Sequence, residues 1–466
     1  MPAGGRARAG RDRRRPGGRG VGRRHLPGPG RGRHGAAAPA RGAAARAGRE
    51  RLLRPPGRRR AHPGREPRRR RRDGAGARRP PRGAARLARR GARLGGRVRG
   101  RRPGRRSVHH ARGRRGARRS RRRWRVIVVD GALRPYAWGR IDGLSAWTSA
   151  TSGPQAELWY GALGDTPDAP RHPLLTKLLA AARPLSIQVH PPGDLVAVLW
   201  SDAGHGRGLL VDQVEKNELL VALEPFTSFA GFRDPALTAR IMQGMGLTRV
   251  AQIASGGDFV ATVHALLALS EVEVDEAFRR LSDVIHPLLD ANERSAIELV
   301  RAWYPHDRGA LVALCLAVHE LEPGDAMYVP AGVVHCYVNG LGVEVMTASD
   351  NVLRLGLTGK QLAVPEALAA VSGDEPVLLR PTGDGGVSTY FAPGAPFLVV
   401  ALRDGASWTV PPHTSATVLA VRGEARVTGP SGAEVVAAGR AVLLSPSDGS
   451  PRVEADGHVV VAVSNP

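Results

Sequence analysis

The chain has 466 residues and a formal net charge of +29, which is divided unevenly along its length. Residues 1–123 contain 46 arginines, no lysine and four acidic residues, so they carry +42 and leave −13 for residues 124–466. Two cysteines without a C-x-x-C spacing exclude a disulfide scaffold or a thiolate metal site, and the longest apolar run, around residues 310–318, is shorter than the about 20 residues that cross a bilayer. We therefore expect residues 124–466 to form a soluble, mildly acidic, cytoplasmic protein.

Residues 1–123 consist mostly of Arg, Gly, Ala and Pro, which cannot bury enough apolar surface to offset the entropy of ordering them. We expect a disordered tail. Arginine-rich tails can bind nucleic acid, but no aromatic residues alternate with these arginines. Arginine without lysine is typical of GC-rich DNA translated upstream of a true start, which we place near Val126 or Val128. No apolar segment of a secretory signal is present.

The periodicity of the remaining chain changes twice. Residues 124–230 form short alternating runs broken by Gly, Pro and Asp, which predict strands. Asp234-Pro235 opens a stretch in which apolar residues such as Phe278, Leu281 and Ile285 recur at three- and four-residue steps, which predicts helices. The strand pattern returns at Leu321. The sequence therefore predicts a mainly β protein with a helical insert.

Two segments carry residues of the kind that bind metals. In LSIQVHP, Gln188 and His190 are spaced i, i+2 on a predicted strand, so their side chains point to the same face. Far downstream, residues 324–339 read GDAMYVPAGVVHCYVN, with His335 in the pattern G-x5-P-x-G-x2-H-x3-N. This pattern resembles the second signature motif of the cupin superfamily, in which the histidine is a metal ligand.

These segments, together with others in the same order, closely resemble the type I mannose-6-phosphate isomerases, or phosphomannose isomerases. The resemblance is strong over about residues 130–375. The matching stretches are YAWG (136–139), AELW (156–159), LTKLLAAARPLSIQVHP (175–191), EKNE (215–218), AGFR (230–233), the cupin motif (324–339) and VEVMTASDNVLRLGLTGK (343–360).

The resemblance implies a mainly β fold: a cupin jelly-roll catalytic domain with a helical insert, and a second jelly-roll domain at the C-terminus that has lost its metal-binding histidine. The expected boundaries are 1–123 for the tail, 124–231 and 305–375 for the catalytic domain, 232–304 for the insert, and 376–466 for the C-terminal domain.

The resemblance also implies one Zn²⁺ per chain. Its ligands would be Gln188, His190, Glu218 and His335. Glu218 ends Lys216-Asn217-Glu218 where the family usually has Lys-Pro-Glu, so Glu215 and Glu224 remain competing candidates. By chemistry alone, cobalt, manganese or iron could occupy such a site.

The implied reaction interconverts D-mannose 6-phosphate and D-fructose 6-phosphate through a cis-enediol, feeding mannose and GDP-mannose metabolism. It needs positive charge near the enediolate oxygens, which we expect from the metal and Arg354, and a base, for which Lys216 and Glu344 are candidates. The substrate- and phosphate-binding residues implied are Ser186, Lys177, Lys360, Tyr337 and Trp138. Lys177, Lys216 and Lys360 are the three lysines of the chain, which indicates that these positions require an ammonium.

Asn339-Gly340 is a favoured type I′ turn dipeptide. It predicts a hairpin that places His335 opposite Glu344, or, with a longer loop, Tyr337 opposite Glu344.

Two other function classes remain open. A non-catalytic bicupin that binds a metal or a sugar would keep the ligands but not Arg354 and Lys360. A nucleic-acid-binding protein would depend on the tail. We expect a sugar phosphate as the partner, no membrane, no nucleic acid on the folded part, and a monomer or a weak homo-oligomer.

Deletion of residues 1–123 should leave the metal content and the isomerase activity unchanged, because every motif lies downstream of Tyr136. Elemental analysis and a kinetic assay of the truncated protein would check this. An insoluble or inactive product would show that the tail takes part in folding or catalysis.

Overall fold

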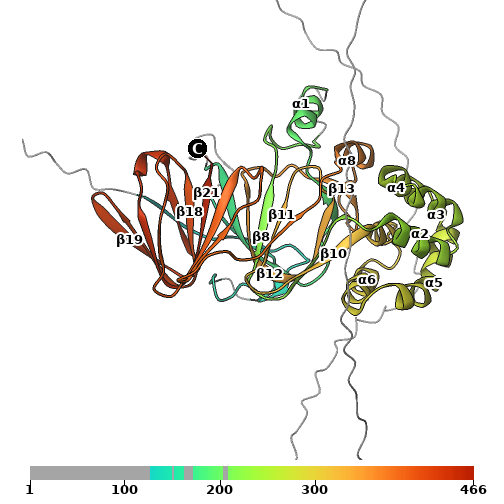
Figure 1. Cartoon of the computed structure of the whole chain (residues 1–466), viewed down its shortest axis with the longest axis horizontal. Helices are drawn as coiled ribbons and strands as arrows, with labels where there is room; N and C mark the ends of the chain where they lie inside the picture. Colours follow the sequence, from blue (N-terminus) through green and yellow to red (C-terminus); the bar gives the residue numbers. More distant parts are fainter. Residues whose placement is uncertain (1–125, 150–151, 162–171, 203–207, 466) are drawn as a thin grey trace, which may run out of the picture. The chain divides into compact units, whose positions relative to one another are not determined.

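A computed structural model of the protein describes residues 126–149, 152–161, 172–202 and 208–465 (Figure 1). The expected tail, residues 1–123, lies outside the described residues. The described part is mainly β and its strand pairs are antiparallel, which confirms the mainly β prediction. The strands are β1 (Ile127–Asp130), β2 (Ala132–Arg134), β3 (Arg140–Ile141), β4 (Pro154–Gln155), β5 (Glu157–Tyr160), β6 (Leu174–Ala181), β7 (Ile187–Val189), β8 (Glu218–Ala222), β9 (Phe226–Phe232), β10 (Leu316–Leu321), β11 (Ala326–Val329), β12 (His335–Thr347), β13 (Leu353–Gly356), β14 (Val377–Leu379), β15 (Val387–Tyr390), β16 (Phe397–Arg403), β17 (Ser407–Thr409), β18 (Ala416–Gly429), β19 (Gly432–Ala437), β20 (Arg440–Leu444) and β21 (Arg452–Ser464).

One sheet of 11 strands contains most of the motif residues. Its main path is β14-β11-β8-β12-β6-β5-β2, and β7, β9, β10 and β13 join through β12. All eight residues of β6 are buried, as expected for a central strand that is covered on both faces.

The strand β12 corrects the hairpin prediction, in both its versions. Asn339 and Gly340 lie inside this continuous strand of 13 residues. The half of β12 that follows Gly340 pairs with β6 and β8, and the half that begins at His335 pairs with β7 and β9, so a turn would leave those backbone groups without partners. Gly340 has φ 146°, and a Cβ atom there would lie 2.2 Å from Phe226 Cδ2. The glycine therefore permits close packing inside a strand and does not make a turn.

The described helices are α1 (Gly193–Asp202), α2 (Pro235–Gly244), α3 (Thr248–Ser255), α4 (Phe259–Leu267), α5 (Glu271–Leu288), α6 (Ala291–Trp303), α7 (Gly309–Val312) and α8 (Val364–Ala370), with 3₁₀ turns at Ala313–Cys315 and Pro446–Asp448. The helices from α2 to α6 lie in the stretch where the sequence predicts helices. The helices α7 and α8 lie outside that stretch, and α1 lies where the sequence predicts strands. Asp234 caps α2 by accepting a hydrogen bond from Leu237 N, and α5 begins with a capping box of Ser270 and Glu273. Figure 1 shows α2 to α6 gathered beside β10.

A second sheet of eight strands follows the order β1-β20-β18-β21-β16-β15, with β17 and β19 at its sides. Two strands belong to a different sheet from the one that the expected domain boundaries predict for them. β1, from the segment 124–231, pairs with β20, and β14, from the segment 376–466, pairs with β11. Strands that pair over such distances in sequence have no local sequence pattern that predicts their partner.

One apolar core joins the two sheets, since it combines Leu178 and Val343 of the first with Phe397, Val399 and Val460 of the second. Cys315 and Cys336 are both buried and free, and burial raises the pKa of each thiol. Among the described helices, none is long and apolar enough to span a bilayer.

Candidate active site

The short strand β7 places functional side chains from three strands side by side. Gln188 lies opposite His335 of β12 on one side and opposite Arg354 of β13 on the other. Directly opposite residues of antiparallel strands project from the same face, so the three side chains form a row. Gln188 Nε2 is 3.1 Å from His335 Nε2. The row therefore places two side chains that can bind a metal, Gln188 and His335, beside the cationic Arg354.

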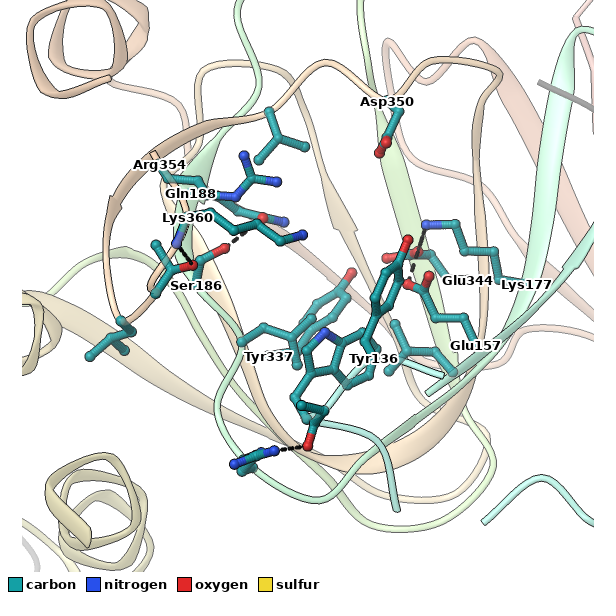
Figure 2. Close-up of a pocket in the computed structure, with 18 of the residues that line it drawn as sticks. Tyr136, Glu157, Lys177, Ser186, Gln188, Tyr337, Glu344, Asp350, Arg354 and Lys360 are labelled. Atoms are coloured by element: carbon teal, nitrogen blue, oxygen red, sulfur yellow. Dashed lines mark hydrogen bonds and ion pairs between the residues drawn. The ribbon is translucent and has the colours of Figure 1, made fainter. Parts of the chain in front are cut away.

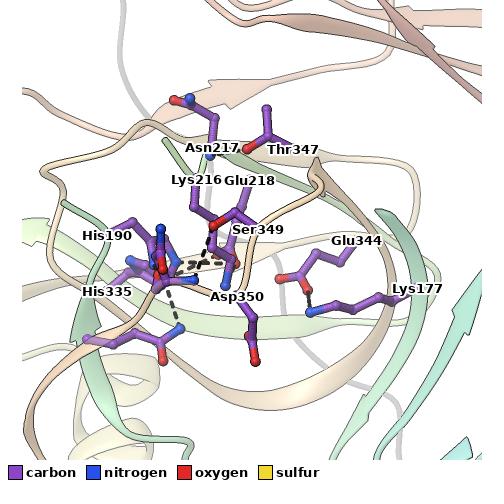
Figure 3. Close-up of polar contacts among 12 residues, drawn as sticks. Lys177, His190, Lys216, Asn217, Glu218, His335, Glu344, Thr347, Ser349 and Asp350 are labelled. Carbon is purple, nitrogen blue, oxygen red and sulfur yellow. Dashed lines mark hydrogen bonds and ion pairs between the residues drawn. The ribbon is translucent and has the colours of Figure 1, made fainter. Parts of the chain in front are cut away.

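Glu218, the first residue of β8, lies between two imidazoles (Figure 3). Its Oε1 is 3.2 Å from His190 Nε2, and its Oε2 is 3.3 Å from His335 Nε2. The three ligand atoms lie within 4.8 Å of one another, and all three residues are fully buried. This is the one such group of His, Cys, Asp or Glu found in the described part of the chain.

The backbone fixes the orientation of both imidazoles. His190 Nδ1 lies 2.8 Å from the carbonyl oxygen of Asn351, and His335 Nδ1 lies 3.0 Å from that of Val333. A proton on each Nδ1 can be donated to these carbonyls, which leaves each Nε2 with its lone pair towards Glu218. Metal-binding histidines are typically oriented in this way.

The electrostatics also suit a metal ion. Burial lowers the pKa of His190 to about 3, with a further contribution from Lys216, so this imidazole is neutral. Burial acts to raise the pKa of Glu218, but Lys216, His190 and His335 outweigh it and hold the pKa well below its usual range. Within the described residues, His190 Nε2 and Glu218 Oε2 are buried without a well-aligned hydrogen bond. Neutral nitrogen and anionic oxygen donors with unused capacity are what Zn²⁺ binds.

The two competing carboxylates lie elsewhere. Glu215 accepts hydrogen bonds from Gly193 N and from Asn217 Nδ2. Glu224 is half exposed and pairs with Arg140 at 2.6 Å. Neither belongs to the group of possible ligands, so the structure favours Glu218.

A cavity of about 310 Å³ adjoins this group and contains the other sequence-predicted residues. It is lined by Trp138, Lys177, Ser186, Gln188, Lys216, Glu218, Tyr337, Glu344, Arg354 and Lys360, among others. All three lysines of the chain therefore line one pocket. Figure 2 shows two groups on opposite sides of it: Ser186, Gln188, Arg354 and Lys360 on one, Glu157, Lys177 and Glu344 on the other.

Lys177 is held between two carboxylates. Its Nζ lies 2.9 Å from Glu344 Oε2 and 3.5 Å from Glu157 Oε1, and the Trp159 ring centroid is 5.2 Å away. Burial acts to lower the pKa of Lys177, but Glu157 and Glu344 outweigh it and raise this pKa. Burial, with Glu218, raises the pKa of Glu344, and Lys177 opposes that shift. The three groups form one buried charge network.

The opposite side of the pocket is more open. Ser186 Oγ donates to Gln188 Oε1 at 3.3 Å, and the exposed Lys360 has its Nζ 5.2 Å from the centroid of Tyr136. Arg354 is about half buried, and burial lowers its pKa while Asp350 opposes the shift. Two cations and a hydroxyl are available here for an anionic group.

Sequence reasoning missed several residues at this site. Glu157 and Tyr136 line the pocket, although AELW and YAWG were noted only as matching stretches. Asn351 holds His190 through its carbonyl, and its side chain accepts from Val211 N. Asn217, in the place of the family's proline, accepts from Tyr328 Oη and Ala331 N. Their contacts depend on strands that are far apart in sequence.

Comparison with known proteins agrees with the family resemblance of the sequence motifs. The family model described as "Phosphomannose isomerase type I, catalytic domain" matches residues 163–235. Mannose-6-phosphate isomerase of Escherichia coli K12 is 30% identical over 287 residues, which cover 52% of this chain and 73% of that protein. The mouse protein of the same name is 28% identical over 305 residues, covering 52% and 71%.

Solved structures show the same fold. A variant of phosphomannose isomerase from Salmonella typhimurium aligns with a TM-score of 0.64 and 24% identity, covering 72% of this chain and 98% of that one. A zinc-bound mannose 6-phosphate isomerase aligns with a TM-score of 0.63 and 23% identity, covering 73% and 99%.

Proposed function

Because this chain belongs to the family of type I mannose-6-phosphate isomerases, we propose that it interconverts D-mannose 6-phosphate and D-fructose 6-phosphate through a cis-enediol, feeding mannose and GDP-mannose metabolism. The observation that carries this proposal is the buried group of His190, Glu218 and His335 beside a pocket that is lined by Arg354 and all three lysines of the chain. A catalytic site needs both the metal ligands and the charged pocket that binds the substrate. A metal-binding module needs the metal ligands alone.

We assign one Zn²⁺ to Gln188, His190, Glu218 and His335. The orphaned His190 Nε2 and Glu218 Oε2 fit such an ion, and the zinc-bound relative supports the choice of metal. When bound, the ion would supply positive charge beside the oxygens on C1 and C2 of the sugar. Lys216 Nζ, 2.8 Å from Glu218 Oε1, would keep that carboxylate ionised and oriented.

Arg354 would stabilise the negative charge that develops when a proton leaves carbon. Arg354 of β13 lies directly opposite Gln188 of β7, so its side chain is on the side of the pocket that carries this candidate metal ligand. A guanidinium stays charged and can bind two oxygens in one plane. Its preorganised donors would therefore favour an enediolate over the ground state.

We assign the transfer of the proton between C1 and C2 to Glu344 rather than to Lys216. The pKa of Glu344 is raised, which suits a base that must also return the proton. Lys216 is ion-paired with Glu218 and so is poorly placed to lose its charge. Lys177, whose ammonium is bound by Glu157 and Glu344, is then a positioning residue for the base and not a phosphate ligand.

The phosphate of the substrate would bind at Ser186 and Lys360, and Trp138 and Tyr337 would contact the sugar. Lys360→Ala should raise KM for mannose 6-phosphate about tenfold or more while kcat changes little. A charged hydrogen bond is worth about 1.5–3 kcal/mol, and a phosphate remote from C1 and C2 is bound equally in ground and transition states. Lys360→Arg should retain most of the affinity. Steady-state kinetics of both variants would check this, and a fall in kcat at constant KM would assign Lys360 to the chemistry.

We also propose that the 11-stranded sheet is a cupin jelly roll that carries the site, interrupted by the insert 232–304, and that the eight-stranded sheet is a second jelly roll. The PxG turn before His335 supports the first assignment, since Gly332 adopts φ 90° there. The two histidines of the second sheet region, His413 and His458, belong to no group of possible metal ligands in the described residues.

A coupled assay that follows fructose 6-phosphate formation from mannose 6-phosphate tests the proposal. Turnover that depends on the substrate's phosphate and on bound zinc is expected. Zinc-loaded protein with no turnover would instead support a non-catalytic metal- or sugar-binding bicupin.

A further inference from the structure

Three basic side chains lie in a row on the C-terminal sheet, outside the catalytic pocket. Arg403 of β16 lies directly opposite His458 of β21, and Arg422 of β18 lies directly opposite the same histidine from the other side. Such residues share a face of the sheet, with Cβ atoms about 5 Å apart. The row therefore places one imidazole between two side chains that carry guanidinium groups.

The row borders a cavity of about 440 Å³. Its other walls come from Trp147, Glu224 and several apolar residues, which are Ala146, Leu223, Leu341, Val421 and Ala438. None of these residues lines the catalytic pocket, so the two cavities are distinct.

The histidine at the centre of the row has unused hydrogen-bonding capacity. His458 is 5% exposed, and its Nε2 is buried without a hydrogen-bond partner among the described residues. Burial, together with Arg403 and Arg422, lowers the pKa of His458 to about 3, so the ring is neutral. Leaving a buried polar nitrogen unpaired costs free energy that a ligand would recover.

The nearby carboxylates do not neutralise the two arginines. Glu224 is paired with Arg140. Asp404 lies 3.7 Å from Arg422, and both side chains are 70% exposed, where an ion pair contributes little. Within the described residues, Arg403 forms no ion pair, so the cavity has an excess of positive charge.

The frame around the row is fixed before any ligand binds. The register of β18 shifts between Ala420 and Arg422, which brings Arg422 into line with His458. The Trp147 indole donates to the carbonyl of Val421 at 2.6 Å, and so holds the residue at the shift. Gly439, at φ 86°, packs against the Trp147 backbone, where a Cβ atom would lie 2.7 Å from Trp147 O.

We propose that Arg403, Arg422 and His458 form a second, non-catalytic binding site for a small oxyanion of the phosphate type, here called the C-terminal anion site. Guanidinium groups bind phosphate oxygens in pairs, and the neutral imidazole can donate or accept one further hydrogen bond. A doubly charged anion would neutralise the charges of the two arginines. The ligand is either free phosphate or the phosphoryl group of a larger molecule.

Two titrations test the site, both on the full chain at constant ionic strength. In the first, NMR of the histidine rings is followed during addition of inorganic phosphate or of glycerol 1-phosphate, with His458→Gln used to assign the His458 signals. We expect the His458 signals to shift and saturate with at least one ligand. The ligand that causes the shift shows whether the site binds free phosphate or a phosphomonoester. If the His458 signals stayed in place with both, the proposal would be wrong.

The second titration compares phosphate dissociation constants by calorimetry in a Lys360→Ala background, which weakens the catalytic phosphate contacts. Arg403→Ala with Arg422→Ala should weaken binding about tenfold or more, as expected for loss of charged hydrogen bonds. The matched control is Arg426→Ala with Arg452→Ala, which removes the same charge from exposed positions of β18 and β21. It should leave the constant unchanged. Equal weakening in both pairs would mean that phosphate responds to net charge alone, and would overturn the site.

Discussion

Removal of the metal will reduce isomerase activity by about a hundredfold or more, and added Zn²⁺ will restore it. The magnitude follows from the several kcal/mol that a Lewis acid supplies to a developing negative charge, at about 1.4 kcal/mol for each factor of ten. Lys216 is already ion-paired with Glu218, so its charge cannot replace that of the ion. Dialysis against a strong chelator, followed by elemental analysis and assay, measures the effect. Full activity in protein shown to be metal-free would refute the mechanism.

Variants at the ligands should reproduce the effect of the chelator. His335→Ala or Gln188→Ala should lose zinc and activity together, whereas His306→Ala, which changes an exposed histidine, should lose neither. Glu218→Gln is less informative, because it leaves the buried Lys216 without its partner and so can destabilise the fold by about 3–5 kcal/mol. Circular dichroism of each variant separates loss of metal from loss of fold.

Arg354→Lys should reduce kcat by at least about a hundredfold while the zinc content stays unchanged. This is the scale seen when one preorganised donor to an oxyanion is removed. Lysine keeps the positive charge but loses the planar pair of donors, and its ammonium cannot span two oxygens.

The control for this substitution is Arg380→Lys, because Arg380 makes a peripheral ion pair with Asp325 and is 81% exposed. We expect it to have wild-type kinetics. Steady-state rates and metal analysis on both variants decide the question. If Arg354→Lys turned over at nearly the wild-type rate, the arginine would be structural, and a non-catalytic bicupin would gain support.

Local patterns in the sequence were sufficient to choose several of the candidate metal ligands. Gln188 and His190 could be chosen because an i, i+2 spacing on a strand determines a common direction, and His335 because a glycine, proline and asparagine pattern surrounds it. In the structure, His190, Glu218 and His335 come together as a possible metal group, and Gln188 lies 3.1 Å from His335. The three lysines, rare in this chain, also line one pocket.

Features that depend on strand pairing between distant parts of the sequence could not be predicted in the same way. Asn339-Gly340 has the composition of a turn, yet the pairing of β12 with four other strands keeps it extended. Glu157 enters the site because β5 pairs with β6, which brings Glu157 close to Lys177. No local signal predicts which strand will be the neighbour, so the hairpin was wrong and Glu157 was overlooked.

The pairing of β1 with β20 has a consequence for synthesis on the ribosome. The Arg440 guanidinium meets the Asp130 carboxylate across 310 residues of chain. At about 5–20 residues per second, the nascent chain waits roughly 15–60 s before the partner of β1 has been made. During that interval Ile127–Asp130 is an unpaired strand edge that is available to other chains. Chaperone capture during translation should therefore concentrate on the first strand, and last until the C-terminal sheet has emerged.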